Sequence, residues 1–331
     1  MKVTEEAYKL HHSSFVADLH ADTLLWDHLF GYDMLKRHDS KLPYSPLFNH
    51  IDAPRMLDGG VSLQAFAICT NYWLGKKKSA QKKAIRLDEI VKNSPVLEWA
   101  LSGTKAEEVH KSGVMGVFLA MEGIHPLEGK IENLEWFHKK GLRYASLTHF
   151  NNTEAAYAST LPWNKNKKIT RFGKYLIGAM NDLKIMVDLA HINYQGFFDA
   201  INHSRDPVIV SHSVVGKGNH PRALNYKQIH AIAENNGVIG IMFSPLFLNN
   251  SLYGTVEDIV DHIDYVKKLA GIDYVALGSD FDGFIHLPKG LKDISDLPVL
   301  TQVMMDRNYT EEEIQKVLGL NFLRVYKEVC G

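Results

Sequence analysis

Short runs of apolar residues recur along the chain, and most are followed by a stretch whose apolar positions repeat with a helical period. The apolar runs are rich in Val, Ile, Leu, Ala and Phe and show little alternation, which is typical of parallel β-strands covered on both faces. We therefore predict eight strands, at residues 16–22, 61–70, 114–122, 144–149, 185–191, 207–212, 238–243 and 274–280.

The stretches between these runs have the spacing of amphipathic helices. Examples are residues 81–99, 131–140, 171–183, 227–235 and 256–269. Two helix starts carry capping residues: Thr255 precedes one of them, while Thr310 and Glu313 form a capping-box pattern at the other. Beyond Thr310 the apolar residues fall on one helical face, so we predict a docked C-terminal helix at about 310–329.

Alternation of about eight strands with helices over 331 residues predicts an α/β protein. Two architectures fit this pattern, a doubly wound open sheet and a (β/α)8 TIM-like barrel. The barrel makes a prediction of its own, because its active site lies at the C-terminal ends of the strands. Catalytic side chains should then follow many different strands.

Six of the eight predicted strands end in His, Asp or Glu. Such residues are uncommon in apolar strands, and a barrel would bring all of these ends to one face. Any one of them could be an ordinary structural residue, but six independent coincidences are implausible. The residues are His20, Asp22, Glu122, His149, His191, His212 and Asp280.

This set of side chains predicts a metal site. Its donors are nitrogen and oxygen atoms without a thiolate, which suits Zn²⁺, Mn²⁺, Co²⁺ or Fe²⁺. The set holds more donors than one tetrahedral zinc ion can use. Either two metal ions bind, or some of the groups transfer protons.

Three further residues lie close to these positions in the sequence. We interpret Asp188 as a carboxylate that supports a ligand or the local structure, and Asp282 as one that caps a loop. Arg222 ends the loop after the sixth predicted strand. Its guanidinium is suited to bidentate capture of a substrate carboxylate, and an ordinary surface contact at a helix start fits equally well.

Composition excludes several classes of protein. Lys and Arg number 37 against 38 Asp and Glu, so the chain lacks the basic footprint of a nucleic-acid binder. Two cysteines are too few for a disulfide framework or a zinc ribbon. We see no signal peptide, membrane span or lipid-anchor signal and expect a cytoplasmic protein, unless a leader has been removed.

The assembled motifs resemble those of the membrane (renal) dipeptidase family of binuclear zinc peptidases, and the chain looks like a bacterial-type soluble member. The resemblance runs from His20 to about Val325. The motifs are D-L-H-A-D-T at 18–23, M-E-G at 121–123, L-T-H at 147–149, V-D-L-A-H at 187–191, S-H-S at 211–213, H-P-R at 220–222, G-S-D-F-D-G at 278–283 and N-F-L-R-V at 321–325.

The resemblance implies a single TIM-like barrel domain over residues 1–331, with the docked C-terminal helix and two zinc ions per chain. It implies that His20 and Asp22 bind the first ion, that His191 and His212 bind the second, and that Glu122 bridges them. Asp280 would be the catalytic carboxylate. His149 would act in catalysis and in substrate binding, and Arg222 would bind substrate.

We therefore expect a metal-dependent dipeptidase that uses a metal-bridging hydroxide. The family tolerates a D residue on the C-terminal side of the dipeptide, and it is commonly dimeric, so a homodimer is expected. Another metal hydrolase of the amidohydrolase type, such as a deaminase or lactonase, is the alternative enzyme. A catalytically silent metal-binding barrel is the alternative outside enzymes.

Overall fold

The structure, a computed structural model, describes residues 2–38, 47–69, 77–216 and 220–331. Eight parallel strands form a closed barrel in which each strand pairs with two neighbours, and pairing of β2 with β4 completes the ring. Around the ring they are β1 Ala17–Ala21, β2 Leu63–Cys69, β4 Met115–Glu122, β5 Leu142–Ser146, β6 Met186–Asp188, β7 Ile209–Val215, β9 Val238–Ile241 and β10 Val275–Leu277. The expected (β/α)8 barrel is confirmed, and the open sheet is excluded.

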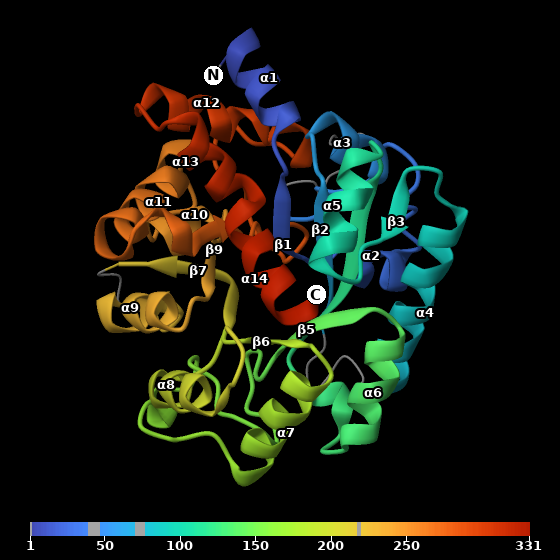
Figure 1. Cartoon of the computed structure of the whole chain (residues 1–331), viewed down its shortest axis with the longest axis vertical. Helices are drawn as coiled ribbons and strands as arrows, with labels where there is room; N and C mark the ends of the chain where they lie inside the picture. Colours follow the sequence, from blue (N-terminus) through green and yellow to red (C-terminus); the bar gives the residue numbers. More distant parts are fainter. Residues whose placement is uncertain (1, 39–46, 70–76, 217–219) are drawn as a thin grey trace.

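Helices surround the strands (Figure 1). Those between successive strands include α4 Lys77–Asn93, α5 Gly103–Lys111, α6 Ile131–Lys139, α7 Arg171–Asp182, α8 Tyr194–His203, α9 Tyr226–Glu234 and α11 Val256–Ala270. The remaining α-helices are α1 Glu5–Ser13, α2 Thr23–Phe30, α3 Ala53–Asp58, α10 Pro245–Leu248, α12 Pro298–Asp306, α13 Glu311–Gln315 and α14 Asn321–Cys330. Four of the five predicted amphipathic helices, α6, α7, α9 and α11, agree with the structure to within one residue at each end.

The fifth, predicted at 81–99, is wrong in its second half. Helix α4 ends at Asn93, and the chain then forms the short strand β3 Leu97–Trp99, which pairs with β4. Pro95 explains the stop, because the residue before a proline is disfavoured in helical conformation. Apolar spacing continued across this break and misled the prediction.

The strand predicted at 207–212 also has different bounds. Strand β7 begins at Ile209 and continues to Val215, so His212 lies within the strand instead of at its end. A second short strand that was not predicted, β8 Ala223–Leu224, pairs with this extension. Residues 217–219 of the loop between them lie outside the described residues.

The C-terminal helix seals one end of the barrel. It contains the predicted capping box, in which Thr310 Oγ1 accepts from the Glu313 N–H at 3.2 Å. A π-helical turn, Lys316–Leu320, then separates α13 from α14. On α14 the rings of Phe322 and Tyr326 pack on Phe118 of β4, with centroids 6.0 and 5.2 Å away. In Figure 1, α14 crosses in front of the strands, which leaves the opposite, carboxyl end for a site.

No helix among the described residues is both long enough and apolar enough to cross a bilayer.

The N-terminal helix α1 is held by a buried histidine. His11 Nδ1 lies 2.8 Å from Thr301 Oγ1 on α12, and its Nε2 lies 2.9 Å from the Gly59 carbonyl oxygen. Burial lowers the pKa of His11 to about 4, because a charged imidazole would lose its hydration there. The ring is therefore neutral in the folded protein near neutral pH.

We expect His11 to make the fold acid-sensitive. As the pH falls from the ordinary histidine pKa of 6.5 to about 4, the unfolded chain binds a proton that the folded protein does not. The free energy of unfolding should therefore fall through this window, by up to about 3 kcal/mol from this group. Urea unfolding as a function of pH should show a shallower slope for His11→Gln. The same change at exposed His230 should keep the wild-type slope, and an unaltered slope in His11→Gln would rule out His11 as its source.

Candidate metal centre and substrate cavity

The seven side chains that the sequence predicts for metal binding and proton transfer lie together at the carboxyl ends of the barrel strands. With the strand that each belongs to or follows, they are His20 and Asp22 (β1), Glu122 (β4), His149 (β5), His191 (β6), His212 (β7) and Asp280 (β10). All seven are at most 5% exposed. The barrel thus brings together residues from six strands in one buried group.

Glu122 is at the centre of this group. Its Oε1 lies 2.9, 3.3, 3.4 and 3.7 Å from the Nε2 atoms of His191, His212, His149 and His20, respectively. Three groups of potential ligands among the described residues share this carboxylate. One of them contains Cys69 and His149. The other two are sets of nitrogen and oxygen donors, one with His20 and Asp22 and the other with His191 and His212. Within each set the ligand atoms lie within 4.8 Å of one another. Glu122 is thus placed to contact cations in both sets.

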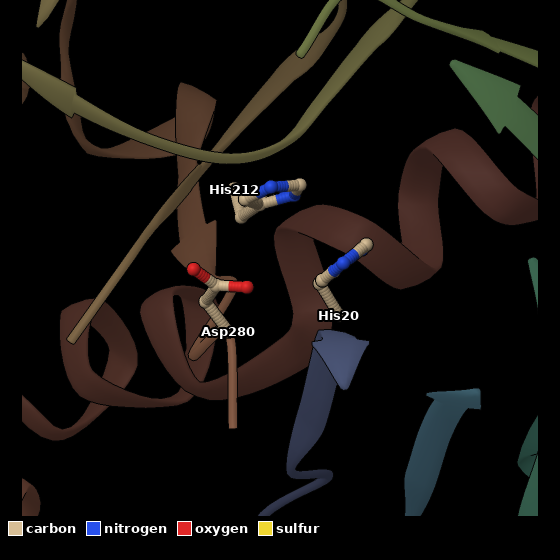
Figure 2. A group of neighbouring side chains, drawn as sticks. All are labelled: His20, His212 and Asp280. Carbon is tan, nitrogen blue, oxygen red and sulfur yellow. The ribbon is translucent and has the colours of Figure 1, made fainter. Parts of the chain in front are cut away.

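A group without Glu122 joins the two sets of nitrogen and oxygen donors. Figure 2 shows His20 on its strand, His212 beside it and Asp280 facing the two rings. The imidazole rings of His20 and His212 stack with their centroids 3.8 Å apart. Potential ligand atoms of all three residues lie within 4.8 Å of one another. Asp280 is therefore next to both sets of ligands.

Several of these atoms lack hydrogen bonds. His20 Nε2, Asp22 Oδ1 and Glu122 Oε2 are buried and have no hydrogen-bond partner within the described part of the chain. An unsatisfied buried polar group costs about 1–3 kcal/mol, and more when it is charged. Cations would satisfy all three atoms at once, and the imidazole and carboxylate donors suit divalent transition metals. The residues present fit a metal centre.

Burial is the main cause of the shifted pKa values in this cluster of histidine and carboxyl groups. Burial lowers the pKa of His20 to about 4 and lowers the pKa of His212 well below its usual range. Burial, together with the nearby charge of Glu122, raises the pKa of Asp22 and Asp280 well above the usual carboxyl range. Bound cations would reverse the carboxyl shifts, because they stabilise the ionised form.

Two of the residues are held in a strained backbone conformation. His191 has φ of 65° and Asp280 has φ of 64°, values in the left-handed region that non-glycine residues rarely adopt. Such strain costs about 1–3 kcal/mol and persists only where the surroundings enforce it. Each residue lies three positions after the last residue of a strand, and the side chains of both reach the site.

Arg222 forms part of the wall of the same cavity. Its guanidinium is buried, donates from Nη2 to the His212 carbonyl at 3.2 Å, and lies 5.4 Å from the centroid of the Phe247 ring. The structure therefore excludes a surface contact at a helix start. The cavity has a volume of about 400 Å³ and is also lined by Asp22, Glu122, His149, His191 and Asp280. Much of its remaining wall is apolar, with Leu25, Phe150, Leu246, Phe247, Leu252, Phe284 and Ile285.

The two supporting carboxylates bond to different parts of the site. Asp188 accepts from the Ser211 hydroxyl at 2.7 Å and from the Ser211 N–H at 2.8 Å, next to His212. Asp282 accepts from the Thr23 hydroxyl at 2.6 Å and from the His50 N–H at 2.7 Å. Asp188 thus contacts the residue before a predicted ligand, whereas the buried Asp282 links the start of α2 to the segment before α3.

Two residues of the site are not predicted from the sequence. Cys69 ends β2 and lines the cavity, with its Sγ 4.0 Å from His149 Nδ1. Burial raises the pKa of its thiol well above the usual range, which favours the uncharged form. Tyr144, whose hydroxyl lies 2.8 Å from His20 Nδ1, was predicted only as part of a strand. Cys69 has a sequence signal, since it is another potential ligand at a strand end, but Tyr144 is indistinguishable from an ordinary core residue.

A closed (β/α)8 barrel with a buried cluster of potential metal ligands at its carboxyl end is typical of TIM-barrel metal hydrolases. The chain belongs to the membrane dipeptidase family (peptidase family M19), whose sequence model matches residues 4–330. The resemblance inferred from the motifs is confirmed, and the chain is a metallopeptidase of the dipeptidase type.

Individual relatives agree with this assignment. The dipeptidase aclJ of Aspergillus oryzae is 28% identical over 331 aligned positions, covering 95% of this chain and 78% of the relative. A metallopeptidase from Rhodobacter sphaeroides, solved with a phosphinate mimic of the dipeptide L-Ala-D-Ala, is 24% identical with a TM-score of 0.87, covering 96% of this chain and 99% of the other. A third protein, a solved family M19 dipeptidase, is 25% identical with a TM-score of 0.86 and has the same coverage.

We predict that Glu122→Gln loses metal from both sets of ligands, because a neutral amide is a poor ligand for two cations. Metal content after dialysis against a low concentration of zinc, measured by mass spectrometry, should fall well below the wild-type value. Glu128→Gln, a change outside the cavity, should keep the wild-type value. Wild-type metal content in Glu122→Gln would show that the ions do not depend on this carboxylate.

Proposed function

We propose that the chain binds two zinc ions and hydrolyses dipeptides. His20 and Asp22 would hold one ion, His191 and His212 the other, and Glu122 would bridge them. The observation that carries the proposal is the central position of Glu122, whose Oε1 lies within 3.7 Å of four imidazole nitrogens. A carboxylate that bridges two metal ions must lie between the ligands of both, and Glu122 has this position.

When bound, the metal ions supply Lewis acidity toward the scissile carbonyl and an activated water. Asp280 would take the proton of that water and pass it to the leaving amine. The buried Asp280 carboxyl group is placed for both steps, because it lies next to both sets of potential ligands and lines the cavity. His149 would donate a hydrogen bond to the carbonyl oxygen as negative charge develops there.

Arg222 would select dipeptides by binding the free C-terminal carboxylate. A buried guanidinium facing a largely apolar cavity gains most from a ligand that brings its own negative charge. A cavity of about 400 Å³ suits a small ligand. The mimic of L-Ala-D-Ala bound by the Rhodobacter sphaeroides relative supports acceptance of a D residue on the C-terminal side. The expected homodimer and cytoplasmic localisation rest on the resemblance and on sequence signals, and they stay predictions.

The first test combines metal analysis with a panel of L,L- and L,D-dipeptides. We expect about two zinc ions per chain and hydrolysis that a chelator abolishes. Asp280→Asn should keep both ions and lose at least about 100-fold in kcat, because it lacks the proton acceptor. Wild-type turnover in that variant would contradict the role of Asp280. Bound metal without cleavage of any dipeptide would favour a deaminase or lactonase.

The proposed role of Arg222 in binding the C-terminal carboxylate is tested by comparing dipeptides with their C-terminal amides. Arg222→Ala should raise KM for a free dipeptide by about 10–100-fold, the effect of losing one charge-assisted pair. For the matching dipeptide amide the two proteins should differ little, because the carboxylate is absent. Arg222→Lys should restore part of the affinity as a point charge. If Arg222→Ala raises KM equally for the free dipeptide and for its amide, the substrate carboxylate does not bind Arg222.

A further inference from the structure

Two of the proposed metal ligands are hydrogen-bonded at their Nδ1 atoms to hydroxyl groups. His20 Nδ1 lies 2.8 Å from the Tyr144 hydroxyl, which in turn lies 2.7 Å from the Leu19 carbonyl oxygen. His212 Nδ1 lies 2.9 Å from the Ser211 hydroxyl, which lies 2.7 Å from Asp188 Oδ2. Each imidazole is thus joined through a hydroxyl to an oxygen that accepts hydrogen bonds.

The direction of these hydrogen bonds fixes the histidine tautomers. A hydroxyl has one hydrogen, and the Leu19 carbonyl can only accept, so the Tyr144 hydrogen is directed to it. The Tyr144 oxygen then accepts from His20, whose Nδ1 must carry the hydrogen. The Nε2 of a neutral His20 ring is consequently a bare lone pair.

The same argument applies to His212. Asp188 Oδ1 accepts the N–H groups of Ala190 and Ser211, and Oδ2 takes the Ser211 hydroxyl hydrogen. The Ser211 oxygen is therefore left to accept from Nδ1 of His212. This ring, too, presents the Nε2 lone pair.

Both of these nitrogen atoms lie close to the same carboxylate. His20 Nε2 and His212 Nε2 lie 3.7 and 3.3 Å from Glu122 Oε1. Two lone pairs facing a carboxylate oxygen repel it unless cations lie between them. His191 differs, because its Nδ1 has no hydrogen-bond partner among the residues that the structure describes. Its tautomer is therefore not fixed in this way.

We propose that Tyr144 and Ser211 are positioning residues, each of which fixes the tautomer and orientation of one histidine ligand. Tyr144 acts on the ion held by His20, and Ser211, with Asp188 behind it, acts on the ion held by His212. The proposal rests on the ligand assignment of the proposed function, and it requires the two hydroxyls to affect different ions.

The test uses variants that remove only the hydroxyl, Tyr144→Phe and Ser211→Ala. In metal-free protein with ¹⁵N-labelled histidine, NMR reports which ring nitrogen carries the hydrogen. We expect Tyr144→Phe to lose the Nδ1–H form of His20 and to keep that of His212. Ser211→Ala should lose the Nδ1–H form of His212 and keep that of His20. Zinc titration against a competing chelator should show about 10–100-fold weaker binding of one ion in each variant, the His20 ion in Tyr144→Phe and the His212 ion in Ser211→Ala. Loss of a residue that hydrogen-bonds to a metal ligand generally weakens metal binding by this factor.

Two controls separate positioning from general stability. Tyr326→Phe makes the same chemical change at the opposite end of the barrel, where this hydroxyl donates to the Ala100 carbonyl at 2.6 Å, and should leave both zinc affinities unchanged. Ser211→Thr keeps a hydroxyl and should restore the tautomer of His212. Unchanged tautomers and zinc affinities in Tyr144→Phe and Ser211→Ala would overturn the proposal, as would equal weakening of both ions in each variant.

The NMR measurement needs neither metal nor substrate. If no dipeptide is cleaved while the tautomers change as expected, the proposed function fails and the positioning role stands. If dipeptides are cleaved while the tautomers do not change, the positioning role fails alone.

Discussion

The burial of one carboxylate, Glu122, is the constraint on which the rest of the site depends. A carboxylate that is 2% exposed loses nearly all of its hydration, which is tolerable only with strong compensating interactions. The neighbouring His149 imidazole and the hydrogen bond with His191 Nε2, 2.9 Å away, hold its pKa well below the usual range against the effect of burial. The closed barrel makes this arrangement possible, because it brings the ends of β1, β5, β6 and β7 around the end of β4.

Strand β4, which carries Glu122, is held on both sides and at its opposite end. Closure of the ring through the pairing of β2 with β4 fixes the strand that carries this residue on both sides. At the other end, α14 packs its aromatic rings against Phe118 of the same strand. The end of the barrel opposite the site is thereby closed to water by apolar side chains. Strand β4 therefore connects the sealed end to the candidate metal centre.

The sequence predicts the barrel and the clustering of polar side chains at its carboxyl end, because both depend on patterns that a strand displays directly. Apolar runs without alternation marked all eight barrel strands, and the polar residues that ended them were conspicuous. Prediction failed where a local signal competed with periodicity. Pro95 stopped a helix whose apolar spacing continued to Trp99, and β7 extended past His212 because β8 supplies a partner that could not be seen in advance.

The supporting residues were harder to predict, for a different reason. Tyr144 and Ser211 lie inside strands and are fully buried, so in the sequence they look like core positions. Their importance depends on which atom each hydroxyl meets across the barrel, from Tyr144 on β5 to Leu19 on β1. No spacing along one strand contains that information.

As a hydrogen-bond partner of a histidine Nδ1 in this site, a hydroxyl group has a physical advantage over a carboxylate. The site already contains the carboxyl groups of Asp22, Glu122 and Asp280, and each further negative charge would raise their pKa values and oppose ionisation. A carboxylate bonded directly to a histidine would add such a charge. The Ser211 hydroxyl keeps Asp188 one group further away, and Tyr144 uses a backbone carbonyl instead of a carboxylate. Neutral hydroxyl groups thus contact the imidazoles while keeping additional charge away from the carboxyl groups of the candidate metal centre.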